Sequence, residues 1–235
     1  MLSNNQIDGI GAKLRKDEID AQCLKRLEEF RQLFVPAYEY VEDILANKMG
    51  LKITGRPSKS TVAIIEKLRR ETIRLSQIQD IAGCRVLVAD LAAQDNLVLN
   101  MQVMLQDVEI DDKRRNPTNG YRAIHVIAKK LGRPVEIQVR TAMQHAWANL
   151  SEKVADEFGH SIKYGIGDVD AIRFLSQLSE ATASLELIRH NKMALAQKKA
   201  RLGKTKEIVR LGKKLSDEER NCMRAIRSIF AGKKA

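Results

Sequence analysis

Residues that could bind a phosphorylated, ring-bearing molecule gather in two stretches near the middle of the chain. The first reads Asn119-Gly120-Tyr121-Arg122-Ala123-Ile124-His125, and the second reads Val135-Glu136-Ile137-Gln138-Val139-Arg140-Thr141. Polar and apolar residues alternate in the second stretch, which predicts a strand with one packed face and one polar face. An aromatic ring, an imidazole, a carboxylate and guanidinium groups on neighbouring strands would suit an anionic substrate such as a nucleotide.

The segment between the two stretches, Leu131-Gly132-Arg133-Pro134, is typical of a short turn. A turn of this length predicts that the two strands pair antiparallel. This pairing would bring polar residues of the first strand close to polar residues of the second. The residues concerned are Tyr121, Arg122 and His125 on the first strand, and Glu136, Gln138 and Arg140 on the second.

A second carboxylate, Asp80, stands directly before the apolar stretch Ile81–Val88, which predicts a strand buried on both faces. Asp80 and Glu136 on one sheet could hold Mg²⁺ while one of them accepts a proton, as phosphoryl transfer to a hydroxyl requires. A single acidic residue is more often a surface or structural acid. Cations favour the catalytic interpretation, because the transferred phosphates need positive charge around them. Those predicted at strand ends and in nearby loops are Arg56, Lys59, Lys67, Arg85, Arg122 and Arg140.

The elements that must position these residues follow from hydrophobic periodicity. Residues from about 12 to 47 predict two helices with a break at Pro36, and residues 50–59 predict a loop. Ser60 can cap a helix over about 61–71. A helix over about 92–105, a strand near 107–111 and a polar loop over 112–119 follow. Strand, helix, strand, loop, strand, strand is the order of an α+β fold with a small mixed β-sheet flanked by helices.

Helical patterns continue after the second stretch. Trp147, Leu150, Val154 and Phe158 recur at helical spacing, and we expect Trp147 to pack this helix onto the sheet. A long helix is predicted over about 168–200 and a final one over about 216–230. We expect residues 1–50 to form N-terminal helices packing on the core, residues 51–165 to form the core, and residues 166–235 to form a basic helical extension.

The charge of the chain is +11, and its excess of cations is uneven. Residues 189–214 hold ten Lys or Arg and a single acid, Glu207. Such a block attracts polyphosphate or nucleic acid. The alternative is a solvated helix face on a basic protein.

The composition limits the class of protein. Apolar residues make up 44% of the chain, enough for an aliphatic core, and neither a long apolar run nor a signal peptide is evident. We therefore expect a cytoplasmic protein. The cysteines Cys23, Cys84 and Cys222 are far apart, which argues against a disulfide framework or a zinc site and favours reduced thiols.

The order of these motifs resembles the synthetase domain of the RelA/SpoT family. The motifs are Gly55-Arg56 with Lys59, Ile64-Ile65-Glu66-Lys67, Asp80-Ile81-Ala82-Gly83-Cys84-Arg85 and the two stretches described first. The resemblance implies a nucleotidyltransferase-like fold that moves the β,γ-pyrophosphate of ATP to a ribose 3′-hydroxyl, usually of GDP or GTP. It covers about residues 34–164, so the chain resembles a single-domain small alarmone synthetase.

The resemblance also implies roles for residues at matching positions. Asp80 matches the Mg²⁺ ligand, and Glu136 matches the acid that assists the metal or activates the hydroxyl. Tyr121 matches the ring on which the acceptor base stacks, with His125 beside the acceptor and the transferred phosphates. The ATP-binding region corresponds to Arg56, Lys59, Lys67 and Arg85, and the acceptor strands also carry Arg122, Gln138 and Arg140.

Two departures from the family pattern affect this comparison. The family commonly has Arg-x-Lys in the ATP loop, whereas this chain has two residues between Arg56 and Lys59. The lysine that often precedes the acceptor tyrosine by four residues is replaced by Pro117, with Lys113, Arg114 and Arg115 upstream. None of the four histidines is followed by Asp, so the metal-binding His-Asp pair of the family's hydrolase domain is missing and we expect synthesis without degradation.

Three functions remain open. The first is a pyrophosphokinase that makes ppGpp or pppGpp. The second resembles the toxic small synthetases, which modify the 3′ end of tRNA or make adenosine alarmones, and which would have an antitoxin protein as partner. The basic block at residues 189–214 favours tRNA. The third is a non-catalytic nucleotide-binding or RNA-binding module, against which the intact Asp80 and Glu136 count. The family's small members often form tetramers, so a homo-oligomer is also open.

Overall fold

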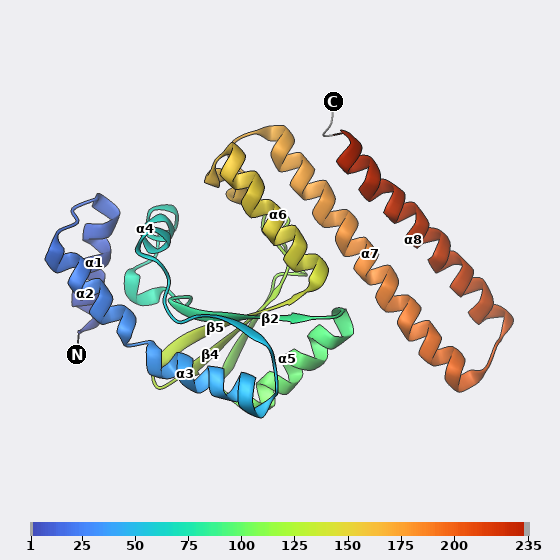
Figure 1. The fold of residues 1–235 in the computed structure, drawn as a ribbon, viewed down its shortest axis with the longest axis horizontal. Helices are drawn as coiled ribbons and strands as arrows, with labels where there is room; N and C mark the ends of the chain where they lie inside the picture. The colour runs from blue at the N-terminus through green and yellow to red at the C-terminus, as the bar shows by residue number, and fades with distance from the viewer. Residues whose placement is uncertain (1, 233–235) are drawn as a thin grey trace. The chain divides into compact units, whose positions relative to one another are not determined.

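The structure, a computed structural model that describes residues 2–232, contains a five-stranded β-sheet (Figure 1). Its strand order is β1-β2-β5-β4-β3. The strands are β1 (Ile53–Arg56), β2 (Ala82–Val88), β3 (Val108–Asp112), β4 (Ile124–Lys130) and β5 (Arg133–Thr141). The predicted α+β class and the predicted inner position of β2 are confirmed.

Along the chain, helices lie before, between and after the strands of the sheet. The α-helices are α1 (Asn4–Lys16), α2 (Ala21–Gln32), α3 (Val35–Asp43), α4 (Thr61–Arg70), α5 (Leu91–Leu105), α6 (Ala142–Phe158), α7 (Val169–Leu202) and α8 (Lys206–Gly232). Shorter helical turns are η1 (Ile44–Lys48), η2 (Leu75–Gln77) and η3 (His160–Tyr164). None of the helices in residues 2–232 combines the length and apolar character that a membrane span requires.

The chain divides into two compact units. The first contains Met1–Val86, Val98–Asp111 and His125–Val139. The second contains Leu87–Leu97, Asp112–Ile124 and Arg140–Ala235. Strand β5 therefore contributes Glu136 and Gln138 to the first unit, and Arg140 and Thr141 to the second.

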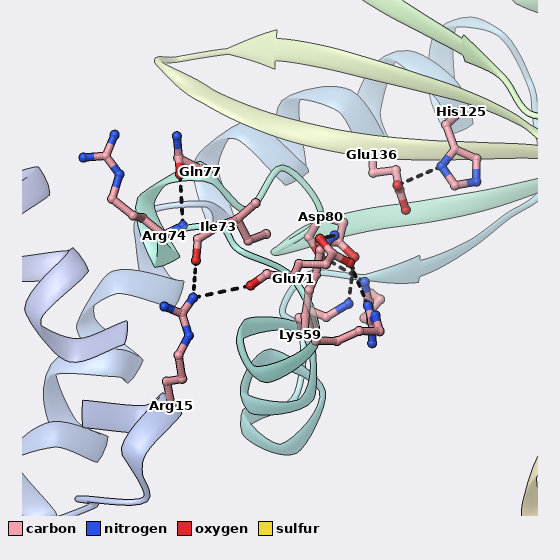
Figure 2. A network of polar contacts seen from close by, with 12 residues as sticks. Arg15, Lys59, Glu71, Ile73, Arg74, Gln77, Asp80, His125 and Glu136 are labelled. Carbon is pink, nitrogen blue, oxygen red and sulfur yellow. Dashed lines mark hydrogen bonds and ion pairs between the residues drawn. The ribbon is translucent and has the colours of Figure 1, made fainter. Parts of the chain in front are cut away.

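The first unit has the aliphatic core that the composition predicts. Val135, Ile137 and Val139, the apolar face of β5, are fully buried. Helix α1 packs on α4 and η2. The Arg15 side chain of α1 donates to the backbone oxygen of Leu68 in the last turn of α4 at 2.7 Å. It also donates to the backbone oxygen of Ile73, which follows α4, at 2.5 Å (Figure 2).

The second unit is held together by a helical cluster. Trp147 of α6 packs with Phe174, Leu175 and Leu178 of α7, and its indole N–H donates to the Leu175 carbonyl at 2.9 Å. We predicted that Trp147 packs its helix onto the sheet, but its partners in this cluster lie on α7. A large ring with one donor is buried well where a neighbouring helix supplies both apolar contacts and an acceptor.

The N-terminal prediction was wrong in two details. Three helices form where two were expected, and Pro36 lies in the first turn of α3, where a residue without an N–H is tolerated. The segment predicted as a loop contains the short strand β1, which pairs antiparallel with β2, Arg56 opposite Gly83. Four residues with Gly55 among them give a weak strand pattern, and pairing with β2 supplies what local propensity lacks.

The first of the two polar stretches was also predicted inaccurately. Strand β4 begins at Ile124, so Tyr121 and Arg122 lie in the turn before it. Positive φ angles at Asn119 (50°) and Gly120 (86°) bend the backbone there. The turn between β4 and β5 is shorter than predicted, with positive φ at Leu131 (48°) and Gly132 (73°). Two such residues are typical of a two-residue antiparallel hairpin.

The two predicted C-terminal helices are confirmed, but α8 begins at Lys206, earlier than expected. Asp168 caps α7. Helices α7 and α8 pack along each other as a hairpin (Figure 1). The basic block at residues 189–214 therefore covers the end of α7, the connection and the start of α8.

Candidate functional site

Asp80 is the centre of a cationic cluster in the first unit. Its two carboxylate oxygens accept hydrogen bonds from Lys59 Nζ at 2.7 Å and Lys67 Nζ at 3.0 Å, and its backbone oxygen accepts one from Arg56 at 3.1 Å (Figure 2). Only 14% of the Asp80 side chain is exposed. Three of the four cations expected to bind ATP thus converge on the acid expected to act in catalysis.

The lysines determine the ionisation of Asp80. Burial alone would raise the pKa of this carboxyl group, but the charges and hydrogen bonds of Lys59 and Lys67 outweigh it and lower the pKa to about 2. Asp80 is therefore ionised throughout the physiological range, as a metal ligand must be.

Local structure places each of the cations. The Lys59 N–H donates to the Ile81 carbonyl at 2.7 Å, which ties the loop to the start of β2. The Ser60 hydroxyl accepts a hydrogen bond from the Ala63 N–H and caps α4, the helix that carries Lys67. Although two residues separate Arg56 from Lys59, both reach Asp80. Arg85, the fourth predicted ATP ligand, lies on β2 opposite Thr54.

Glu136 and His125 form a second buried pair in the first unit. His125 Nδ1 lies 2.9 Å from a Glu136 oxygen (Figure 2). The Gln138 amide donates to the other oxygen at 2.8 Å. Burial opposes ionisation of Glu136 and so does the charge of Asp80, yet the His125 contact lowers the Glu136 pKa overall. The predicted proximity of His125, Glu136 and Gln138 is confirmed.

Gly83 explains how β2 approaches Glu136 so closely. A Cβ at position 83 would lie 2.6 Å from the Glu136 backbone oxygen, closer than any side chain can be accommodated. The glycine of the Asp80–Arg85 segment is therefore required by the packing of β2 against β5.

Asp80 and Glu136 are the side chains that could hold a metal ion. Carboxylate oxygens suit Mg²⁺, which typically takes one or two protein carboxylates and completes its shell with water and substrate phosphates. Within residues 2–232, no group of three or more His, Cys, Asp or Glu side chains gathers as a metal cage. The donor set thus fits a metal that arrives with a phosphate ligand better than a resident structural metal.

Of the predicted acceptor residues, Tyr121, Arg122 and Arg140 lie in the second unit, whereas His125 and Gln138 lie in the first. The Arg140 guanidinium donates to the Tyr121 hydroxyl at 2.8 Å and lies 5.0 Å from the centre of the Tyr121 ring. Tyr121 also packs against the cluster around Trp147. The predicted contact between the two polar stretches at Tyr121 and Arg140 is confirmed.

Arg122 turns away from this pair and binds α7. Its Nε donates to the Ser179 hydroxyl at 3.1 Å, and its terminal nitrogen donates to the Arg114 carbonyl at 3.0 Å. Arg114 is itself held by Asp112 and Asp95 at 2.8 Å each, whereas 84% of the Arg115 side chain is exposed. Of the basic residues near Pro117, Arg115 is thus accessible to a ligand.

Sequence reasoning missed Ser179 and Glu186, which both contact predicted site segments. The Ser179 hydroxyl donates to the Gly120 carbonyl at 2.6 Å, and the Thr141 hydroxyl donates to Glu186. Both residues lie on one face of a long helix with a weak hydrophobic pattern. A polar residue on such a helix carries no signal in the sequence that distinguishes it from a solvated one.

The geometry agrees with what comparison with known proteins finds. Residues 55–164 match the family model described as a region found in RelA / SpoT proteins. This match agrees with the resemblance that the sequence motifs indicate.

Individual relatives differ in how much of the chain they match. An uncharacterized protein of Mycobacterium tuberculosis is 34% identical over 172 residues, which cover 69% of this chain and 62% of that protein. The chain thus spans less than two thirds of that relative's length. A GTP pyrophosphokinase of Haemophilus influenzae is 28% identical over 164 residues, 60% of this chain and 22% of the relative.

A solved structure extends the comparison to the fold. Small alarmone synthetase 1 from Bacillus subtilis, bound to its product pppGpp, is similar with a TM-score of 0.55 at 23% identity. The match covers 71% of this chain and 97% of that one. The small alarmone synthetase fold predicted from the sequence is confirmed.

Proposed function

We propose that this protein is a pyrophosphokinase that transfers the β,γ-pyrophosphate of ATP to the 3′-hydroxyl of GDP or GTP, producing ppGpp or pppGpp. The observation that carries the proposal is the cluster of Lys59, Lys67 and Arg56 around Asp80. The charge of Asp80 also acts on the ionisation of Glu136. The matching family region and the GTP pyrophosphokinase relative support it.

The proposed reaction assigns the first unit to ATP. The acceptor's 3′-oxygen attacks the β-phosphorus, the bond between that phosphorus and the oxygen bridging to the α-phosphate breaks, and AMP leaves. Negative charge grows on the phosphate oxygens and the leaving group, and Arg56, Lys59 and Lys67 supply the balancing positive charge. Arg85 is assigned to the same ATP region.

Glu136 is the proposed acceptor of the hydroxyl proton. Its lowered pKa keeps it ionised at neutral pH, and the hydrogen bonds from His125 and Gln138 fix the direction of its oxygens. His125 would hold the carboxylate in place while the proton moves to it.

Mg²⁺ is the proposed metal, held by Asp80 and Glu136 together with the phosphates of ATP. When bound, it would neutralise charge on the β- and γ-phosphates. Lys59 and Lys67 each donate to one oxygen of Asp80 in this structure, and each oxygen keeps a second lone pair that could bind the metal. Both lysines would then lie beside the phosphates of ATP.

The second unit is assigned to the acceptor base. Tyr121 offers a ring for stacking, at small entropic cost because the ring is already held by Arg140. Arg140 covers one side of that ring, so the base stacks on the opposite side or takes the place of the guanidinium. Arg115, being exposed, is the proposed contact for acceptor phosphates.

An acceptor assay tests the proposal directly. The protein is incubated with ATP labelled at the β- or γ-phosphate, Mg²⁺, and GDP, GTP, ATP or bulk tRNA in separate reactions. Label on GDP or GTP, with release of AMP, is the expected result. Label on tRNA alone, or on an adenosine nucleotide alone, would identify that molecule as the acceptor in place of GDP or GTP. If no acceptor gains label, the protein is a non-catalytic binding module.

A tRNA end is the second candidate acceptor, because the structure concentrates the basic block at one end of the α7/α8 hairpin. Acids pair with both ends of the block: Glu219 with Arg189 at 3.0 Å and Lys192 at 2.8 Å, and Glu218 with Lys214 at 3.8 Å. The exposed cations between these pairs are Lys198, Lys199, Arg201, Lys204, Lys206, Arg210 and Lys213.

The tip of the hairpin is also hollowed. A depression of about 510 Å³ is lined by Lys204, Lys206, Arg210 and Lys213, with Thr205 and Val209. Lys206, Arg210 and Lys213 follow one face of α8 at steps of four and three residues, about 6 and 4.5 Å along the axis. A row of cations fits a chain of phosphates, whereas a free nucleotide needs no extended cationic surface.

A further inference from the structure

Ser179 of α7 holds the backbone on both sides of Tyr121. This side chain is 2% exposed. Its hydroxyl donates to the carbonyl of Gly120 at 2.6 Å and accepts a hydrogen bond from Arg122 Nε at 3.1 Å. The Ser179 hydroxyl thus donates a hydrogen bond to one chain neighbour of Tyr121 and accepts one from the other.

A second contact from the same helix lies two turns further on. Glu186, seven residues after Ser179, accepts a hydrogen bond from the Thr141 hydroxyl. Thr141 follows Arg140, whose guanidinium binds the Tyr121 hydroxyl. Residues separated by seven positions lie on the same helix face, so α7 holds both members of the Tyr121–Arg140 pair through their chain neighbours.

The backbone at Gly120 lies too close to its neighbours to leave room for a side chain. A Cβ on Gly120 would lie 2.8 Å from the Trp147 ring and 3.1 Å from Ser179 Cβ. The Trp147 ring is in turn fixed by its hydrogen bond to Leu175 on α7. The turn is therefore enclosed by α6 and α7, and Ser179 supplies the polar contacts of this enclosure.

We propose that Ser179 is a positioning residue for the acceptor nucleotide, because it fixes the turn from Gly120 to Arg122 and so orients the Tyr121 ring for the acceptor base. The inference rests on the proposed function and adds a specificity element to it. Ser179 lies on α7, beyond the segment 55–164 that matches the RelA/SpoT family. The residues assigned to the acceptor thus include one on the C-terminal helix α7.

Kinetics of Ser179→Ala test this role, with Ser184→Ala as the matched control. Ser184 lies on the same helix, is exposed, and its hydroxyl bonds only to the Glu180 carbonyl of its own helix. We expect Ser179→Ala to raise the KM for the acceptor by about tenfold, the usual effect of losing a buried hydrogen bond, with the KM for ATP changed less than twofold. Ser184→Ala should leave both constants unchanged.

Hydrogen exchange provides a readout that does not depend on activity. The amide of Tyr121 donates to the Thr118 carbonyl at 3.0 Å, and its exchange should be faster in Ser179→Ala than in Ser184→Ala. Unchanged acceptor KM in an active variant overturns the inference alone, even if the melting temperature falls, because the serine would then be structural. A wild-type protein that transfers to no acceptor overturns the proposed function, and the positioning role with it.

Discussion

Glu136 is the residue on which the proposed chemistry depends most directly. Replacing it with Gln keeps the size, but it removes the charge that accepts a proton and one of the two acceptor oxygens. We expect Glu136→Gln to lower the rate of pyrophosphate transfer by at least about 100-fold, the lower range for a general base. Its unfolding transition, followed by circular dichroism, should remain cooperative.

Glu109→Gln is the matched control for this variant. Glu109 lies on β3, and 59% of its side chain is exposed. Its replacement removes the same charge from the same sheet and should leave the rate unchanged. Equal activity of the two variants would exclude Glu136 as the proton acceptor.

Asp80 predicts a specific dependence of stability on pH. Its folded-state pKa of about 2 lies below the ordinary value of 3.8, so the ion pairs with Lys59 and Lys67 stabilise the fold above pH 3.8 and are lost as the pH falls through about 2. The difference in unfolding free energy between wild type and Asp80→Asn should shrink by about 2 kcal/mol from pH 6 to pH 2. Urea titrations at a series of pH values measure it, and a constant difference would contradict the ion pairs.

At the scale of elements, the contact of β2 with β5 predicts a contrast between two glycines. Gly83→Ala places a Cβ 2.6 Å from the Glu136 backbone oxygen, and backbone cannot move aside as a side chain can. We expect a loss of about 2 kcal/mol or more in stability, together with lower activity because Glu136 shifts. Thermal unfolding and the acceptor assay measure the two effects.

Gly9→Ala is the control at this scale. Gly9 lies in α1, and an added Cβ there would meet no atom within 4 Å. Alanine in a helix interior is favoured over glycine by about 0.5–1 kcal/mol, so this variant should be slightly more stable than the wild type. Similar losses for both variants would show that the close approach at Gly83 is not limiting.

The elements also show which parts of the fold could be predicted from the sequence. Alternation in β5 and the long apolar run of β2 predicted strands correctly, since burial of one or both faces leaves a clear pattern. Strand β1 and the turn at Asn119 and Gly120 escaped prediction. Their conformations depend on pairing with β2 and on the enclosure by Trp147 and Ser179, which are distant in sequence.

The site shows the same division. Asp80, Glu136, Tyr121 and the basic residues could be singled out as candidates because they stand in ordered motifs. The pairing of Lys59 and Lys67 with the two oxygens of Asp80 could not be predicted, since it depends on how α4 and the preceding loop are directed. Ser179 gave no signal at all.

At the scale of the whole molecule, the basic hairpin tip predicts salt-dependent binding of RNA. Neutralising Lys198, Lys199 and Arg201 to Gln should weaken binding of tRNA and reduce the slope of log affinity against log salt by about 2, because each phosphate contact contributes about 0.7–0.9. Fluorescence anisotropy at several salt concentrations measures both quantities. Transfer to GDP or GTP should be unaffected.

Arg220, Arg224 and Arg227, each changed to Gln, form the control set. They lie on α8 toward the other end of the hairpin and are exposed. Each triple variant removes three positive charges, so the two variants have the same net charge. If the two sets weaken binding equally, net charge alone attracts the RNA. If neither set matters, the tip is a solvated surface.

The two-residue turn at Leu131 and Gly132 has a consequence for insertions and deletions. Side chains of a strand alternate between its faces, so a shift of β5 by a single residue would exchange the two faces along its whole length. Glu136, Gln138 and Arg140 would then point into the aliphatic core, and Val135, Ile137 and Val139 would replace them. The length of this hairpin is therefore fixed by the polar face that it aligns.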